Sequence, residues 1–249
     1  MFRFNDLFDL FTEKHPPSAG AFLVENLKIE RKAIKHLYLR INPTDGQVYV
    51  TAPQQMGDHE IAQFLEQKQH WIARKRQQLQ DKIQLFPIAN HPLDQIRLWG
   101  DIYTIICVQA KAHSISVDRV QGRLRIAIPD IEDEQSIRSL LNRWLRNQLH
   151  QRISQRLPVF EALSHTCVKE WRIKAMKTRW GTCNFKAGRV WINAELVQLP
   201  PECLDYILLH ELVHLHEPSH NARFHRLVGE FMPHWRESDA LLNRYLLPR

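Results

Sequence analysis

The sequence has little of what marks several large protein classes. Only 8 glycines and 13 prolines occur in 249 residues, which argues against long disordered or low-complexity tracts. No apolar run approaches the roughly 20 residues that a membrane-spanning helix needs, so we predict no transmembrane segment. The first residues also lack the basic region, apolar region and small-residue cleavage site of a secretory signal. These absences favour a globular, cytoplasmic protein.

Cysteines are scarce and scattered along the chain. The four of them, Cys107, Cys167, Cys183 and Cys203, form no CxxC pair. A zinc ribbon and a dithiol redox motif are therefore not indicated. Because no export signal is present, we expect the thiols to be reduced.

Positive charge is concentrated in one part of the chain. The net charge is +7 at pH 7, and between Arg138 and Trp180 ten basic residues stand against two acidic ones. Such a stripe can bind a polyanion, so nucleic acid or a nucleotide is a predicted partner, although a solvated helix face is the simpler interpretation. We call these ten residues the basic stripe: Arg138, Arg143, Arg146, Arg152, Arg156, Lys169, Arg172, Lys174, Lys177 and Arg179.

Apolar periodicity suggests three segments, of which the first two are amino-terminal. In residues 1–20, apolar side chains from Phe4 to Phe11 at helical spacing predict an amphipathic helix that docks on the protein, with membrane-surface association as the alternative. Residues 21–130 are expected to form a β-rich region with one helix. Its hairpin turns at Asp45-Gly46, its helix runs over about 58–82 with Asp58 as candidate N-cap, and further strands follow up to residue 128.

The third segment, residues 131–249, is mainly helical with a small sheet. Apolar residues from Ile137 to Ile153 predict a long helix that bends near Pro158. Strands are expected at about 168–175 and 190–192, with a turn at Gly181 between them. Helices are expected at about 201–216, 221–232 and 236–247. The predicted fold class is therefore α+β.

The stretch HELVHLHEPSH, residues 210–220, predicts a metal site. Residues four apart in a helix lie one above the other, so His210 and His214 share a face and can bind one ion. Glu211 lies beside them, close enough to hold a water that the metal activates, which is the arrangement of the HExxH motif. The rest of this helix is apolar nearly all round, as expected for a buried helix with one polar notch.

A third ligand is expected after this helix. His216 points to the other side of the helix, whereas His220 lies beyond Pro218, where the chain can fold back on the metal. Its spacing matches that of metzincins, with Glu217 in place of their glycine. We therefore favour His220. Weaker alternatives are His225, His234 and Glu230, and a fourth ligand from Cys183 is disfavoured because catalytic zinc keeps one position open.

The carboxy-terminal part resembles a known family. The pieces KTRWGTC (177–183), INAEL (192–196), LDYILLHELVH (204–214) and SHNARFH (219–225) are similar to the YgjP-like metallopeptidase domain, of the wider SprT-like group of minigluzincin-type zinc proteins. The resemblance implies a zincin-like catalytic domain with one Zn²⁺ per chain, held by His210, His214 and His220, and Glu211 as general base. His225 departs from the large aromatic residue expected after Phe224, so the rim of the cleft is expected to differ.

The leading functional hypothesis is a zinc-dependent metallopeptidase that acts on peptides or unfolded proteins through a zinc-activated water, with Glu211 as general base. One alternative is a metal-dependent hydrolase of nucleotides or other phosphate anhydrides, and another is a nucleic-acid-associated SprT-like protease. A non-catalytic zinc scaffold would not need Glu211. We expect the strand near Val190 to pair with the substrate backbone. Candidate substrate-contacting or supporting residues are Asn193, Trp180, Arg223 and His225.

Overall fold

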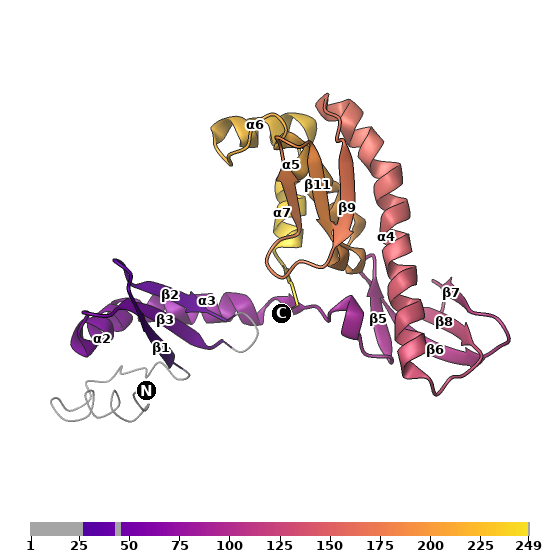
Figure 1. Ribbon diagram of the computed structural model, residues 1–249, viewed down its shortest axis with the longest axis horizontal. Helices are drawn as coiled ribbons and strands as arrows, with labels where there is room; N and C mark the ends of the chain where they lie inside the picture. The colour runs from indigo at the N-terminus through magenta and orange to yellow at the C-terminus, as the bar shows by residue number, and fades with distance from the viewer. Residues whose placement is uncertain (1–26, 43–45, 249) are drawn as a thin grey trace. The chain divides into compact units, whose positions relative to one another are not determined.

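The computed structural model describes residues 27–42 and 46–248, and the chain divides into two compact units, Met1–Lys82 and Ile83–Arg249 (Figure 1). The helix predicted within residues 1–20 lies outside the described residues. The division suggested by the sequence near residue 130 falls inside the second unit. The reason is that the long helix after residue 130 packs on the sheet that precedes it.

The first unit is a three-stranded sheet with two helices. The strands are β1 (Leu27–Lys32), β2 (Tyr38–Ile41) and β3 (Val48–Pro53), in the order β1-β3-β2. The predicted hairpin is confirmed as the antiparallel pair β2–β3, and Gly46 after its turn has a φ of +67°. Alternate residues of β3 are buried on the face that meets the apolar residues of α2 (Asp58–Gln67) and α3 (Gln69–Gln80).

The helix predicted over 58–82 is interrupted. It breaks at Lys68, where φ is −97° and ψ is 1°, and forms α2 and α3 instead of one helix. Its N-cap is Gly57, whose N–H donates to the Glu60 carboxylate at 2.7 Å, rather than Asp58. The apolar spacing continues through Lys68, so periodicity alone could not show the break.

The second unit begins with a four-stranded sheet. Its strands are β5 (Gln95–Leu98), β6 (Asp101–Gln109), β7 (Ser114–Asp118) and β8 (Arg123–Ile128), in the order β5-β6-β8-β7, with β6 and β8 parallel. Before it lie the short β4 (Ile83–Gln84) and the 3-10 helix η1 (Ile88–Asn90). Strand β4 pairs in parallel with β12 (Tyr245–Leu246), so residues from the start and the end of this unit are adjacent.

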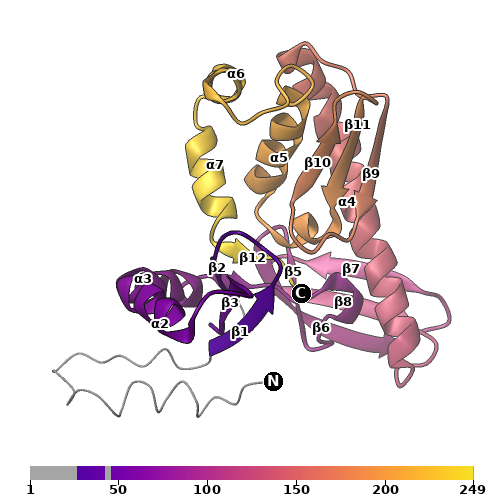
Figure 2. The same cartoon turned by 60° about the vertical axis from the view of Figure 1, so that its left-hand side comes forward.

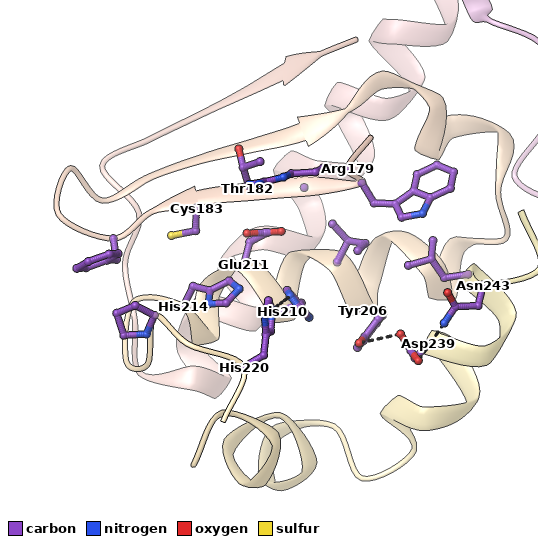
Figure 3. Close-up of a pocket in the computed structure, with 16 residues that line it drawn as sticks. Arg179, Thr182, Cys183, Tyr206, His210, Glu211, His214, His220, Asp239 and Asn243 are labelled. Atoms are coloured by element: carbon purple, nitrogen blue, oxygen red, sulfur yellow. Dashed lines mark hydrogen bonds between the residues drawn. The ribbon is translucent and has the colours of Figure 1, made fainter. Parts of the chain in front are cut away.

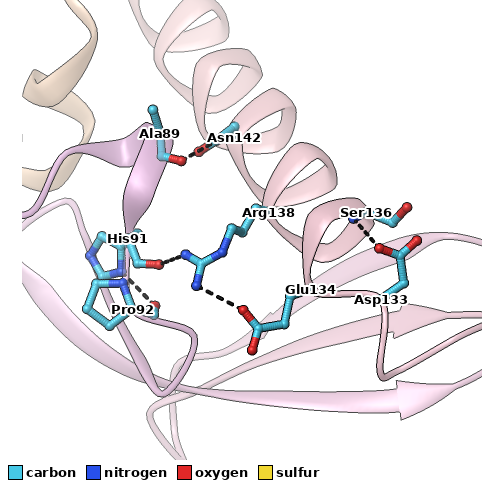
Figure 4. A network of polar contacts seen from close by, with 8 residues as sticks. All are labelled: Ala89, His91, Pro92, Asp133, Glu134, Ser136, Arg138 and Asn142. Carbon is cyan, nitrogen blue, oxygen red and sulfur yellow. Dashed lines mark hydrogen bonds and ion pairs between the residues drawn. The ribbon is translucent and has the colours of Figure 1, made fainter.

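Helix α4 (Glu134–Ser164) links the two sheets of this unit. Its buried side chains recur every four residues from Ile137 to Leu157, as the apolar spacing predicts, and the helix continues past Pro158 to Ser164. Its first turns are held to the η1 segment: Arg138 donates to the carbonyl of His91 and pairs with Glu134, and Asn142 donates to the carbonyl of Ala89 (Figure 4).

The second sheet and its helices carry the predicted site. Strands β9 (Glu170–Lys174), β10 (Gly181–Asn184) and β11 (Arg189–Asn193) have the order β10-β11-β9. They are followed by η2 (Ala194–Gln198), α5 (Pro201–Val213), α6 (Ala222–Phe231) and α7 (Trp235–Leu242). Helix α5 packs against β10, β11, α4, α6 and α7, which explains why it is apolar on almost every side (Figure 2).

These elements confirm the α+β class. Strand β10 was not predicted, because Gly-Thr-Cys-Asn has the composition of a turn. Within the described ranges no helix is both long and apolar enough to cross a membrane.

Candidate metal centre and catalytic cleft

Three histidines converge at the end of α5. Their ligand nitrogens all lie within 4.8 Å of one another, and the Nε2 atoms of His210 and His220 are 2.9 Å apart (Figure 3). His210 and His214 come from successive turns of one helix face. His220 comes from the loop between α5 and α6. The structure therefore brings together the three residues that the sequence predicts as metal ligands.

The loop that carries His220 is shaped by contacts of its neighbours. Nδ1–H of His214 donates to the Glu217 carbonyl at 3.1 Å, which leaves Nε2 of His214 available as a ligand. Nε2–H of His216 donates to the carbonyl of Ser164 at the end of α4, 2.7 Å away. His216 thus turns from the site, as helix geometry predicts.

Phe224 supports all three imidazoles. It is 1% exposed, and its ring centroid lies 4.7–4.9 Å from those of His210, His214 and His220. Asn221 caps α6 by accepting from the N–H of Phe224 at 3.0 Å, which fixes the start of this helix under the histidines. The sequence did not single out Phe224 for this role.

The histidines fit a metal ion. Burial and the neighbouring histidines lower the pKa of His210 to about 3, and burial also lowers the pKa of His214. Both imidazoles are therefore neutral at pH 7, the form that binds metals. Nδ1 of His210 is buried and has no hydrogen-bond partner among the described residues. Three imidazoles with an open fourth position are the donor set of a catalytic zinc site.

Glu211 lies beside this cluster and is 4% exposed. Burial raises the pKa of its carboxyl group to about 8, against an opposing effect of the Arg179 charge. The carboxylate packs directly on Gly181 at the start of β10. A Cβ atom at position 181 would lie 2.5 Å from Oε1 and 2.8 Å from Cγ of Glu211. Because glycine has no Cβ atom, position 181 leaves room for the side chain of Glu211.

A cleft of about 590 Å³ opens above the cluster. Four groups of residues line it: the segment from Arg179 to Phe185, the face of α5 from Tyr206 to His214, the loop residues Pro218 and His220, and residues of α7 and the turn that follows it. Tyr206 precedes His210 by one helical turn, so the spacing on α5 could have indicated it. Asp239 and Asn243 carry no such sequence signal, because only the packing of α7 places them here.

The other candidate residues are distributed unevenly around the cleft. Trp180 lines it. Asn193 does not, because it is fully buried, and its amide donates to the carbonyls of Met176 at 2.7 Å and Arg179 at 2.8 Å. Asn193 thus holds the loop that brings Arg179 and Trp180 to the cleft. Arg223 and His225 are not among the lining residues.

Both of these residues belong to α6 and contact residues outside it. Arg223 pairs with Glu217 at 3.5 Å, and the ring of His225 stacks on Trp235 at a centroid distance of 5.6 Å. Cys183 lines the cleft but does not belong to the cluster of ligand atoms. Burial and the Glu211 charge raise the pKa of the Cys183 thiol to about 11, so it stays protonated at pH 7.

The order of the strands corrects the prediction of which strand pairs with a substrate. Strand β11, which includes Val190, is the central strand, with β10 antiparallel on one side and β9 parallel on the other. Its backbone groups are used within the sheet. Strand β10 lies at the edge of this described sheet, and three of its residues line the cleft.

Several members of the basic stripe are engaged within the fold. Arg156 makes a two-pronged ion pair with Asp205, with both N–O distances 2.9 Å. Arg146 donates to the carbonyl of Ile173 at 3.0 Å, and Lys174 lies over the ring of Trp191. Arg143 is exposed. Part of the basic stripe therefore consists of residues that make contacts within the fold.

Comparisons with known proteins show the family of this chain. The YgjP-like, metallopeptidase domain model matches residues 35–245. One similar solved structure is the crystal structure of the metallopeptidase zymogen of Pyrococcus abyssi abylysin, with 25% sequence identity and a TM-score of 0.33. The match covers 35% of this chain and 89% of that one. No curated protein matches. Because the family model spans most of the chain, this protein belongs to the YgjP-like metallopeptidase family.

Proposed function

We propose that this metallopeptidase is a zinc enzyme that hydrolyses peptide bonds in peptides or unfolded proteins. His210, His214 and His220 would hold the zinc, and Glu211 would act as general base. The observation that carries the proposal is the convergence of three histidines within 4.8 Å beside a buried carboxylate, in a cleft bounded by an edge strand. Zinc, when bound, supplies a Lewis acid that polarises the peptide carbonyl and acidifies water.

The position and the pKa of Glu211 both suit proton transfer. A general base works best when its pKa lies near the working pH, and burial raises the pKa of Glu211 to about 8. A cation held by the adjacent histidines would favour the charged carboxylate and lower this pKa towards neutrality. Glu211 can then accept a proton from water and donate it to the leaving amine.

Strand β10 can hold the substrate in an extended form. An exposed strand edge binds a peptide backbone through main-chain hydrogen bonds, and only one side of β10 is paired within the described residues. The carboxylate of Glu211 contacts Gly181, the first residue of this strand. A peptide along β10 therefore passes next to the general base.

The proposal is tested with Glu211→Gln and a matched control, Glu202→Gln. Glu202 lies in the first turn of the same helix and is exposed, so its replacement changes the same charge away from the cleft. The zinc-loaded proteins are incubated with unfolded proteins and short peptides, and zinc content is measured by atomic emission. We expect Glu211→Gln to keep its zinc and lose hydrolysis, while Glu202→Gln retains both. Equal peptide hydrolysis by the Glu211 variant and the wild type would refute the role of Glu211.

The two alternative functions lack a comparable observation in the cleft. The basic stripe that motivates them is partly engaged in intramolecular contacts. The same incubation includes nucleoside triphosphates, and their hydrolysis by the wild type but not by the Glu211 variant would favour a phosphate anhydride as substrate.

A further inference from the structure

The cleft contains a carboxylate that the proposed chemistry does not use. Apart from the histidines, the charged side chains of its lining are Arg179, Glu211 and Asp239. Glu211 is the proposed base, and Arg179 acts electrostatically on Glu211. Asp239 belongs to α7, on the side of the cleft where Tyr206 lies (Figure 3).

Two hydrogen bonds hold the Asp239 carboxylate in place. The Tyr206 hydroxyl donates to Oδ1 at 3.1 Å, and Nδ2–H of Asn243 donates to Oδ2 at 3.1 Å. Tyr206 is itself fixed, because it is 5% exposed and stacks on Trp235 at a centroid distance of 6.2 Å. Asp239 is thus a positioned group rather than a mobile surface side chain.

The charge of Asp239 has no cationic partner among the residues that the structure describes, since every ion pair found there involves other carboxylates. A carboxylate can accept about four hydrogen bonds, and only two are supplied by Tyr206 and Asn243. A half-buried negative charge that is fixed by neutral donors favours a cation in the cleft beside it.

Asp239 lies within reach of a substrate residue near the scissile bond. Tyr206, which it contacts, precedes His210 by four residues on α5, a rise of about 6 Å along the helix. An extended peptide covers about 3.3–3.6 Å per residue. The site beside Asp239 is therefore about two residues from the metal-binding histidines. Trp180 and Leu242 also line the cleft and offer apolar surface to an aliphatic stem.

We propose that Asp239 determines specificity by binding a cationic group of the substrate within about two residues of the scissile bond. The group is the ammonium or guanidinium of a Lys or Arg side chain, or a free N-terminal ammonium. The proposal rests on the proposed peptidase function, because it names the substrates which that site prefers.

Binding without turnover gives the first test. The probes are short fluorescent peptides in which a single lysine moves along an Ala/Ser background, each compared with its glutamine counterpart, with acetylated or free N-termini. They are titrated into the Glu211→Gln protein with and without zinc. Because a hydrogen bond to a charged group contributes about 1.5–3 kcal/mol, we expect the best lysine peptide to bind about tenfold to hundredfold more tightly than its glutamine counterpart.

Asp239→Asn in the Glu211→Gln background should abolish this preference. Asparagine removes the charge and keeps an acceptor for Tyr206, so the contact between α5 and α7 is retained, while its amide nitrogen takes the place of the oxygen that accepts from Asn243. Asp101→Asn is the matched control, because Asp101 is exposed on β6 and is not part of the cleft lining. If the preference depends on the free N-terminus rather than on lysine, the cationic group is the α-ammonium.

Turnover gives the second test, on otherwise wild-type protein. Asp239→Asn should raise KM for cationic peptides by about tenfold or more while leaving the hydrolysis of neutral peptides within about twofold. A uniform loss of binding or rate on all peptides would show that Asp239 only supports the fold, and an unchanged preference for lysine would also overturn the proposal. If the wild type cleaves no peptide, the peptidase proposal fails, while the binding experiment still decides the role of Asp239.

Discussion

Replacing Gly181 with alanine should displace Glu211, the proposed general base, without removing the histidine cluster. The added Cβ would lie 2.5 Å from Oε1, 2.8 Å from Cγ and 2.9 Å from Cδ of Glu211. Ordinary contact requires at least 3.4 Å, so the carboxylate must move by about 1 Å. Because Glu211 is 4% exposed, it cannot swing freely into solvent.

The expected cost can be estimated from this displacement. Misplacing a reacting group by about 1 Å lowers a rate by about 100-fold, which corresponds to about 2.7 kcal/mol of transition-state stabilisation. Overpacking of a filled site destabilises the folded state by about 1–3 kcal/mol. The three histidines are not among the nearest atoms that the new Cβ would meet, so zinc content should stay the same.

The assay compares kcat, zinc content and urea unfolding for Gly181→Ala and a matched variant, Gly229→Ala. A Cβ at Gly229 would meet Trp235 at an ordinary distance of 3.5 Å, so this variant should remain active. In a Glu211→Gln background, Gly181→Ala should cause no further loss, because both changes act on the same group. Wild-type kcat in Gly181→Ala, or loss of its zinc, would refute the reasoning.

Three further predictions follow from buried or exposed side chains. Burial raises the pKa of Glu195 from 4.5 to about 7, so the folded chain keeps a proton there that the unfolded chain releases. The free energy of unfolding should therefore fall by up to about 3 kcal/mol as pH rises from 4.5 to 7, and Glu195→Gln should remove this fall in urea titrations. Parallel pH profiles for the two proteins would contradict it. Asn193→Ala should leave the carbonyls of Met176 and Arg179 unpaired, cost about 2–4 kcal/mol and speed hydrogen exchange in residues 176–181; unchanged exchange would exclude its anchoring role. If the basic stripe binds polyanions, Arg143→Gln should elute from heparin at lower salt, whereas identical elution would indicate a solvated face.

The parts of the fold that follow from local periodicity could be predicted. The stripe of apolar residues every four positions in α4 locates that helix, and the motif HELVH places α5. Strand β1 was not predicted as a strand, because only Leu27 and Ile29 of its six residues are apolar and the charged run Glu30-Arg31-Lys32 interrupts the alternation. Which strands pair depends on contacts between distant residues, so the central position of β11 was not visible in the sequence.

The residues of the candidate site were likewise predictable only in part. Helical spacing places His210 and His214 on one face, and the break at Pro218 allows His220 to return, so these three were predictable. Asp239 lies in the cleft only because α7 packs on α5, and no local pattern marks it. Asn193 was a candidate because its strand was expected to pair with the substrate backbone, but burial gives it a supporting position rather than one in the cleft.

The parallel pairing of β4 with β12 affects when the second unit can fold during synthesis. Ile83 lies opposite Tyr245, and Ile83 N–H donates to the carbonyl of Arg244 at 2.7 Å. During synthesis from the amino terminus, β4 emerges long before its partner strand exists. The unit therefore cannot complete its native contacts until residues near 245 have left the ribosome, and its folding is late and rich in long-range contacts. Asp239, Leu242 and Asn243 of the cleft lining lie just before β12 in the sequence, so the last wall of the cleft is added at this same late stage.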